Sequence, residues 1–238
     1  MDFNLFDHAV ALIILVVLPL TALRTGSVTE DSTLELPPKI HFFYTNGLIL
    51  IVAAMLILTS WNISPRSWDA MGFDLPIWNP LVLYLTIALA GIYLLDVVVE
   101  YYQSRANPEE MIGNMKDIVP LTWREFGHFS FLAFSAGICE EIIFRGFLTT
   151  YLFHYASING LSDTAVLAIA VLAPALSFAA SHAYQGIVSV LKIFVLAVLF
   201  GLIFLISESL LIVIIVHTVI DLVSGLMTVV VNQAEEAS

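Results

Sequence analysis

Seven long apolar runs, separated by shorter polar connections, make up most of the chain. Each run is long enough to cross the hydrocarbon core of a bilayer, which takes about 20 residues of helix. None alternates apolar and polar residues as the strands of a membrane barrel do. The pattern therefore predicts an all-α, polytopic transmembrane bundle of about seven to eight spans. The runs cover about residues 4–23, 40–61, 80–102, 126–153, 164–183, 187–206 and 208–231.

The composition agrees with this pattern. Of the 238 residues, 60% are hydrophobic and only 12% are charged, against about 25% charged residues in a soluble domain. We therefore expect a multi-pass integral membrane protein of the cell membrane, surrounded by the lipid bilayer and forming a single domain over residues 1–238. The net charge of −12 argues against nucleic acid as a partner, because phosphate binding needs basic surfaces.

The polar connections suggest where the central helix begins and how the chain is oriented. Thr122, followed by Glu125, resembles an N-cap with its capping-box partner. The loops at 24–39 and 103–125 fall on the same side of seven spans and carry five of the six loop Lys and Arg residues. The positive-inside rule then places both loops in the cytoplasm and the N-terminus outside.

The fourth run contains three ionisable side chains, Glu140, Glu141 and Arg145. A charge at the centre of a membrane helix costs roughly 2.5–3.5 kcal/mol, so such residues face a cavity, pair with one another or perform a task. Glu141 and Arg145 are four residues apart, share a helix face and can form an ion pair. Glu140 lies about 100° further round the helix. It has no local cation and is therefore available as a base.

Two other runs add polar groups to this set. The fifth run ends in Phe178 and His182, and the seventh contains His217 and Asp221. Asp221 is one turn from His217 and could fix its tautomer. Phe178 could shield the site from lipid or stack on the His182 ring. Two Glu, two His, one Arg and one Asp in three runs of so apolar a chain indicate one polar catalytic cavity within the membrane.

These groups allow two kinds of hydrolysis. In the first, Glu140 takes a proton from a water held with His182, and the hydroxide attacks a carbonyl while His217 donates to the oxyanion. In the second, His182, His217 and Glu140 bind a divalent metal such as Zn, which acidifies the water. The H-E-x-x-H signature of many zinc proteases is absent. Both alternatives stay open and give peptide-bond hydrolysis inside the bilayer.

Three motifs in this order resemble those of the CPBP intramembrane protease family, often described as metalloproteases, which includes the type II CAAX prenyl endopeptidases and the Abi proteins. The resemblance covers about residues 115–231, the expected family core. It implies an all-helical membrane protein with endopeptidase activity on a membrane-associated peptide or protein, which in CAAX-type substrates is prenylated. The motifs are E-E-x-x-x-R, F-x-x-x-H and H-x-x-x-D, carried by Glu140, Glu141, Arg145, Phe178, His182, His217 and Asp221.

The resemblance also implies roles for individual residues. Glu140 and His182 would activate the water, and His217 with Asp221 would stabilise the oxyanion. Glu141 and Arg145 would hold the site in shape, with Phe178 beside them. The family accepts Asn or Asp at the last position, and an ionised Asp cannot donate a hydrogen bond. We therefore interpret Asp221 as a residue that orients His217, or as a protonated acid.

Other classes of protein are compatible with parts of this pattern. A non-catalytic immunity or scaffolding protein of the same fold would be free to lose Glu140 or His182. A proton-coupled carrier usually shows repeated halves or broken helices, and the sequence has neither. Cys139 lies beside two acids that disfavour a thiolate, which argues against a cysteine protease.

Three further charges lie within the apolar runs. Asp96 and Glu100 are interpreted as lying near the headgroups. Lys192 could extend to the interface or pair with Asp221 or Asp96.

Overall fold

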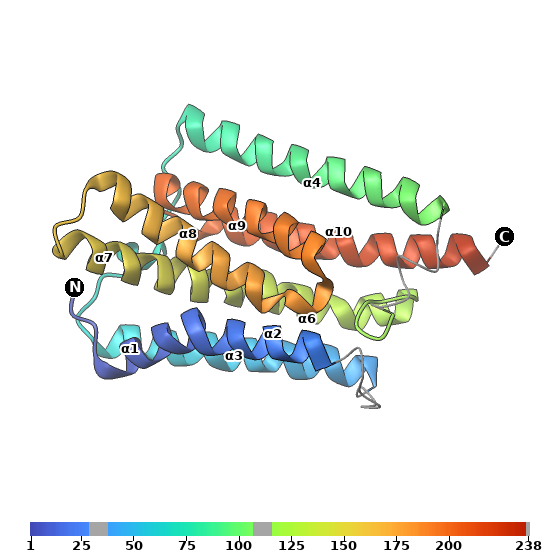
Figure 1. The fold of residues 1–238 in the computed structure, drawn as a ribbon, viewed down its shortest axis with the longest axis horizontal. Coiled ribbons are helices and arrows are strands. Elements are labelled where there is room, and N and C mark those ends of the chain that lie inside the picture. Colours follow the sequence, from blue (N-terminus) through green and yellow to red (C-terminus); the bar gives the residue numbers. More distant parts are fainter. Residues whose placement is uncertain (29–37, 107–115, 237–238) are drawn as a thin grey trace.

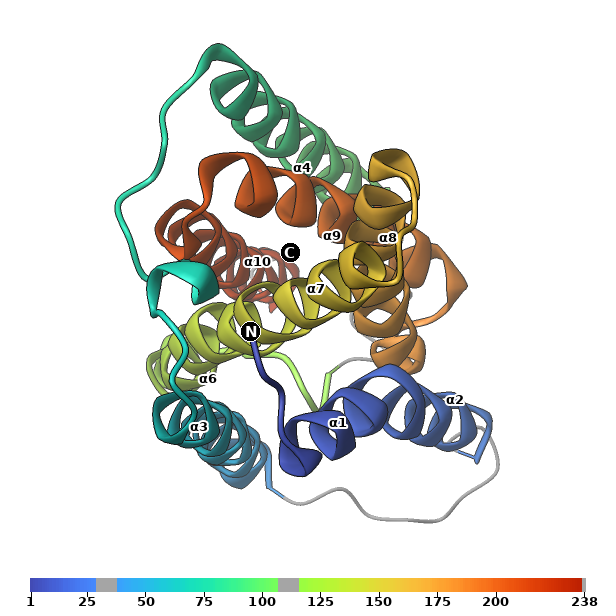
Figure 2. The same ribbon diagram turned by 90° about the vertical axis from the view of Figure 1, so that its left-hand side faces the viewer.

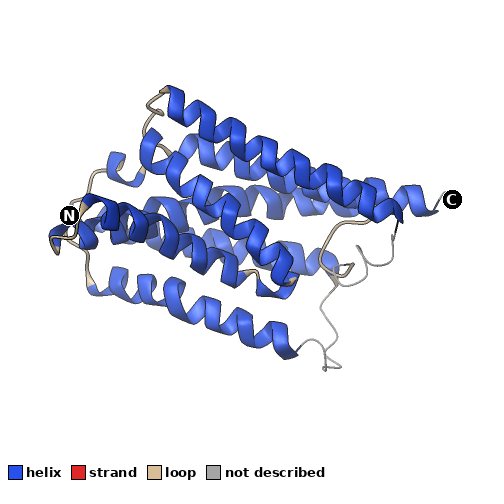
Figure 3. Ribbon diagram, turned by 45° about the horizontal axis from the view of Figure 1, so that its top comes forward, coloured by secondary structure: helices blue, strands red, loops and turns tan. Residues whose placement is uncertain are grey.

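The structure, a computed structural model, describes residues 1–28, 38–106 and 116–236 (Figure 1). The described residues form seven long helical rods and no strand (Figure 3), which confirms the predicted polytopic helical bundle. The two chain ends lie at opposite ends of the bundle, as an odd number of crossings requires. The rods are α1 (Leu5–Leu12) continued by a π-helical turn (Ile13–Val17) and α2 (Leu18–Val28); α3 (Lys39–Ile63); α4 (Pro80–Ala106); α6 (Trp123–Glu141) continued by a π-helical segment (Ile142–Thr149) and α7 (Thr150–Ile158); α8 (Asp163–Ser181); α9 (Ile187–Ser207); and α10 (Leu210–Glu236).

Six of the rods in the described part of the chain are long and apolar enough to cross a membrane. The rod formed by α6 and α7 is the exception, because charged side chains interrupt its apolar sequence. It nevertheless runs from one end of the bundle to the other (Figure 1). It continues to Ile158 rather than ending near Phe153, so the connection expected at 154–163 shrinks to residues 159–162.

The α6–α7 rod lies at the centre of the bundle when viewed along its length (Figure 2). Helix α6 packs against α3 and α10, and α7 packs against α8. Helix α4 lies outermost and rests on α9 and α10. The polar residues of α6 and α10 are therefore surrounded by other helices.

The central helix begins as the sequence predicts, at Thr122. Its side chain accepts a hydrogen bond from the Glu125 N–H at 3.2 Å, as an N-cap does. The Glu125 carboxylate accepts instead from the Leu121 N–H at 2.7 Å and forms an ion pair with Lys39 at 3.0 Å. Partial burial raises the pKa of Glu125, but these hydrogen bonds outweigh that effect and the pKa lies below its ordinary value.

The two helices that carry most of the polar cluster approach closely at glycines. A methyl group on Gly137 of α6 would lie only 2.8 Å from the Thr218 Cα of α10, and one on Gly225 would meet the Phe129 ring. Any side chain at Gly137 would therefore force the helices apart. Another close approach lies at Gly201, where a position equivalent to a Cβ lies 3.3 Å from Val171.

Residues 64–79 connect α3 to α4 and fold against one end of the bundle. Met71 is fully buried, and Gly72 has a φ of +87°, which favours glycine. The Gly72 carbonyl accepts from the Leu210 N–H at 2.9 Å, and the Ala70 carbonyl accepts from Thr150 at 3.2 Å. This loop therefore covers the ends of the helices it contacts.

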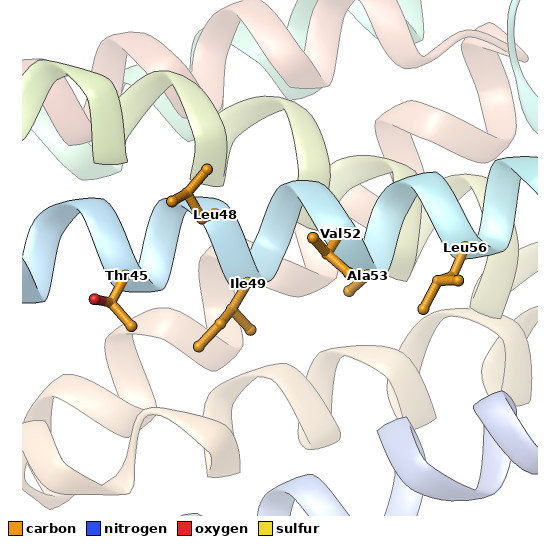
Figure 4. A pocket seen from close by; sticks show the side chains of 6 residues that line it. All are labelled: Thr45, Leu48, Ile49, Val52, Ala53 and Leu56. Atoms are coloured by element: carbon orange, nitrogen blue, oxygen red, sulfur yellow. The ribbon is translucent and has the colours of Figure 1, made fainter.

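One face of α3 forms an apolar groove of about 470 Å³ (Figure 4). Four of its large side chains are more than half exposed, as expected for a helix that faces lipid. No residue of the predicted polar cluster lines it, so the groove lies apart from that cluster. The lining residues are Thr45, Leu48, Ile49, Val52, Ala53 and Leu56.

The intramembrane charges outside the cluster are paired. Lys192 forms ion pairs with Asp96 and, at 2.9 Å, with Glu100, which links α9 to α4. Of the two partners considered from the sequence, Asp96 is the one observed and Asp221 is not. Asp96 and Glu100 are therefore both held by the same cation.

Candidate active site

His217 lies at the centre of the polar cluster, on α10. Its Nδ1 is 2.6 Å from Glu141 Oε1, a hydrogen bond in which the ring N–H donates to the carboxylate. Its Nε2 is 3.8 Å from Glu140 Oε2 and 3.7 Å from Asp221 Oδ2. Separations of this size are typical of groups bridged by a water or a substrate atom rather than bonded directly.

The hydrogen bond to Nδ1 corrects one prediction. The sequence suggests that Asp221 orients His217, because the two residues lie one turn apart on one helix. In the structure Glu141 of the neighbouring helix bonds to Nδ1, and Asp221 is beyond hydrogen-bonding distance of Nε2. Glu141 is therefore the residue that orients His217, while Asp221 faces the other side of the ring.

The predicted ion pair between Glu141 and Arg145 is present. Arg145 NH1 lies 2.8 Å from Glu141 Oε1, and the two side chains are 2% and 0% exposed. The guanidinium also lies over the rings of Phe178 and Phe200, at 5.0 Å and 5.2 Å from their centroids. Arg145 thus neutralises Glu141 within an aromatic environment, where an unpaired carboxylate would be strongly destabilising.

The helix that carries this pair widens immediately after it. Residues Ile142–Thr149 form a π-helical segment, and all eight of its side chains are buried. The Thr149 hydroxyl donates to the Phe144 carbonyl five residues earlier, at 3.0 Å. Segments of this kind are rare and occur frequently at functional sites. The wider turn contains Arg145, so it determines how the guanidinium meets Glu141.

His182 follows the last residue of α8. Its Nδ1 bonds to the Phe178 carbonyl at 2.8 Å, and since a carbonyl only accepts, Nδ1 carries the proton. In the neutral ring this leaves Nε2 unprotonated, free to accept a proton or bind a ligand. Helix α8 is itself anchored by Ser177, whose hydroxyl donates at 2.6 Å to the carbonyl of Ile14 in the π-helical turn of the first rod.

Phe178 connects the two imidazoles. Its ring centroid lies 4.7 Å from that of His182 and 6.1 Å from that of His217. The structure brings together all the motif residues predicted from the sequence, and Phe178 lies against His182 with the two ring planes tilted by 46° rather than stacked.

The cluster has a buried side and an accessible side. Glu141 is fully buried, whereas the side chains of Glu140 and Asp221 are 15% and 26% exposed. His182 is half-buried. The groups predicted to react are thus the ones that solvent can reach, and the supporting pair is enclosed.

The sequence analysis does not single out Tyr184. Its ring centroid lies 6.1 Å from that of His182, with the ring planes 32° apart, and the side chain is 48% exposed. The only sign of its proximity to the site in the sequence is its position two residues after His182. That spacing predicts a contact only once the 3₁₀ turn between α8 and α9 is known.

The donor set was also compared with what a metal ion requires. Within residues 1–28, 38–106 and 116–236, no three His, Cys, Asp or Glu side chains are placed so that they could hold a metal ion. His182, His217 and Glu140 as placed do not fit a three-ligand site, and no step of the chemistry below is assigned to a metal.

The bundle and its cluster define a polytopic integral membrane protein with a group of ionisable side chains inside it. Residues 122–223 match the family model of the Rce1-like type II CAAX prenyl endopeptidases. This stretch lies within the predicted core 115–231 and contains every motif residue, so the predicted resemblance is confirmed. No curated protein and no solved structure shows a significant match to the chain. The family is one of proteases, which supports protease activity on a membrane-associated protein.

Proposed function

We propose that this protein is an intramembrane endopeptidase that cleaves a membrane-associated protein by activating a water with Glu140 and His182. One observation carries the proposal: the ring of His217, at the centre of a helical bundle, has three carboxylates within 3.8 Å. They belong to Glu140, Glu141 and Asp221. Carboxylates and imidazoles at this depth are rare unless they perform a task.

Glu140 is the general base. Unlike Glu141, it has no Lys or Arg within ion-pair distance among the described residues, and its side chain is partly accessible. It takes one proton from a water, and the resulting hydroxide forms a bond to the carbonyl carbon of the scissile peptide. When the tetrahedral intermediate collapses, the C–N bond breaks and the same proton is returned to the leaving amine. The Nε2 lone pair of His182 accepts the second O–H of the water and orients it.

His217 stabilises the oxyanion. Glu141 fixes the ring through Nδ1, which leaves Nε2 as the group that faces the reacting atoms. In the doubly protonated ring, Nε2 donates a hydrogen bond to the negative oxygen and provides a positive charge beside it. Arg145 neutralises Glu141, so this carboxylate can remain charged and hold the ring in place.

The proposed substrate is a protein anchored at the membrane by a lipid, of the prenylated CAAX type that the matched family cleaves. Such a substrate presents its C-terminal peptide close to the bilayer, where its lipid chain remains in an apolar environment. A site enclosed by apolar helices is suited to a peptide that arrives within the membrane.

The experiment compares the purified wild-type protein with Glu140→Gln in liposomes, using fluorogenic CAAX peptides with and without a farnesyl group. Glu140→Gln preserves the size of the side chain and removes the base, so we expect a loss of kcat of at least about 100-fold. A preference for the farnesylated peptide would support the lipid-anchored substrate. Equal cleavage by the two proteins would exclude Glu140 as the base.

A further inference from the structure

The proposed chemistry lacks one hydrogen-bond donor. A tetrahedral oxyanion is usually held by two donors, and His217 Nε2 provides one. Asp221 occupies the position that the family resemblance assigns to the second, but an ionised carboxylate only accepts hydrogen bonds. With two other carboxylates close to His217, Asp221 adds negative charge where negative charge develops. A neutral donor from elsewhere would remove this difficulty.

Tyr184 carries an unused donor at the edge of the site. It lies in the 3₁₀ turn Ala183–Gln185, between the end of α8 and the start of α9. Its hydroxyl oxygen accepts a hydrogen bond from Gln185 Nε2 at 3.0 Å. A phenol has one proton to donate, and within the described part of the chain no acceptor is bonded to it. Gln185 therefore holds the oxygen and leaves the proton available.

The turn that carries Tyr184 is fixed on both sides. His182 precedes it, and Gly186 follows it with a φ of +87°, a conformation that favours glycine. Helices α2 and α9 both contact the turn. Tyr184 is thus held beside His182, with its ring 6.1 Å from the imidazole.

We propose that the Tyr184 hydroxyl is the second donor to the oxyanion, acting opposite His217. This inference rests on the proposed function. It requires no hydrogen bond from Asp221, whose carboxylate lies 3.7 Å from His217 Nε2, and it gives the exposed aromatic ring a role in the reaction. Phe178, His182 and Tyr184 then form an aromatic row that leads from the buried cluster to the accessible edge of the site.

The electrostatics of the turn agree with a donor role. Tyr184 lies in the connection between α8 and α9, outside both spans. Partial burial raises the pKa of its hydroxyl, the hydrogen bond from Gln185 opposes this shift, and the charges of Glu140 and Asp221 raise the pKa further. The ordinary value is already about 10, so the hydroxyl keeps its proton throughout the neutral range. The same charges show that Tyr184 lies within electrostatic reach of both carboxylates.

The test is Tyr184→Phe, which removes the hydroxyl and keeps the ring, with Tyr84→Phe as the matched control. Tyr84 is an exposed tyrosine of α4 and lies outside the site. Using the farnesylated peptide in liposomes, we expect Tyr184→Phe to lower kcat by about 100-fold, the typical effect of losing one oxyanion donor. KM should change less than about twofold, and Tyr84→Phe should match the wild type. Rates are normalised to the folded fraction, measured by the exposure of Cys139 to a thiol reagent.

A second measurement distinguishes a Tyr184 hydroxyl that donates to the oxyanion from a Tyr184 ring that only lines the site. A farnesylated peptide phosphinate, which mimics the tetrahedral intermediate, should bind Tyr184→Phe more weakly than wild type by about the same factor as the loss in kcat/KM. The product peptide should bind both proteins equally.

Two results would overturn the inference while leaving the proposed function intact. These are a wild-type kcat in Tyr184→Phe, and a loss confined to KM. Cleavage that does not depend on Glu140, or no cleavage by the wild type, would remove the proposed function and the inference together.

Discussion

Replacing Arg145 by methionine should strongly destabilise the protein, because it leaves the Glu141 carboxylate buried without its cation. Glu141 is 0% exposed, and its Oε2 has no hydrogen-bond partner within the described residues. Removing one partner of a buried ion pair costs about 3–5 kcal/mol. Methionine preserves most of the side-chain length, so the effect reports the lost charge rather than a cavity.

The expected shift in melting temperature follows from this energy. For a chain of this size, each kcal/mol shifts the midpoint by about 2–4 °C. Arg145→Met should therefore melt about 6–20 °C lower than wild type. The matched control is Lys39→Met, which breaks the ion pair with Glu125, whose side chains are 16% and 25% exposed. Accessible pairs contribute about 0–1 kcal/mol, so the control should shift by at most about 4 °C.

The chain provides its own reporter of unfolding. Cys139 is the single cysteine and is buried beside Glu140. A thiol-reactive fluorophore therefore labels the protein only when the core around the site opens, and its signal against temperature gives the midpoint in detergent. If Arg145→Met melts no lower than Lys39→Met, the buried pair is not what stabilises this region. Combining Glu141→Gln with Arg145→Met should recover part of the loss, because neither charge is then left alone.

Two further predictions concern helix packing and pH. Gly137→Ala should lower the stability of the folded protein and reduce the rate of cleavage at least tenfold, because the new methyl group would push α10 away at Thr218. Gly91→Ala, with no atom within 4 Å of its added Cβ, should change neither quantity. Glu125, whose pKa is depressed, stabilises the fold above its unfolded-state pKa and loses this contribution as the pH falls through its folded value. The stability difference between wild type and Glu125→Gln should therefore be present at about pH 7 and decline as the pH falls below about 4.3, the ordinary pKa of a glutamate, through the lower folded-state value; a difference that does not decline there would contradict this assignment.

The bundle and the contents of its polar cluster follow from the sequence because both depend on local patterns. Apolar runs of about 20 residues define spans, and a spacing of four residues places Glu141 against Arg145. The partner of His217 could not be predicted in the same way. Asp221 and Glu141 are both within reach of that ring, and the choice depends on how α6 and α10 are rotated against each other. That rotation is set by their close approach at Gly137 and by the π-helical segment after Glu141.

Contacts between elements distant in the chain account for the other differences. Lys192 pairs with Asp96 and Glu100 because α4 lies along α9, an arrangement that no periodicity records. The hydrogen bonds of the 64–79 loop to Ser207 of α9 and Leu210 of α10 are equally invisible in the sequence.

The close approach of α6 and α10 at Gly137 also determines which part of the site has its geometry fixed by helix packing. Glu140 and His217 lie on α6 and α10, whose backbones are already in contact near Gly137, so these two helices hold them in a fixed relation to each other. His182 and Tyr184 lie on the other side of the site, at the end of α8 and in the short turn after it, next to Gly186. The distance between Glu140 and His217 therefore depends on the packing of two helices, and not on the position of the turn that carries Tyr184.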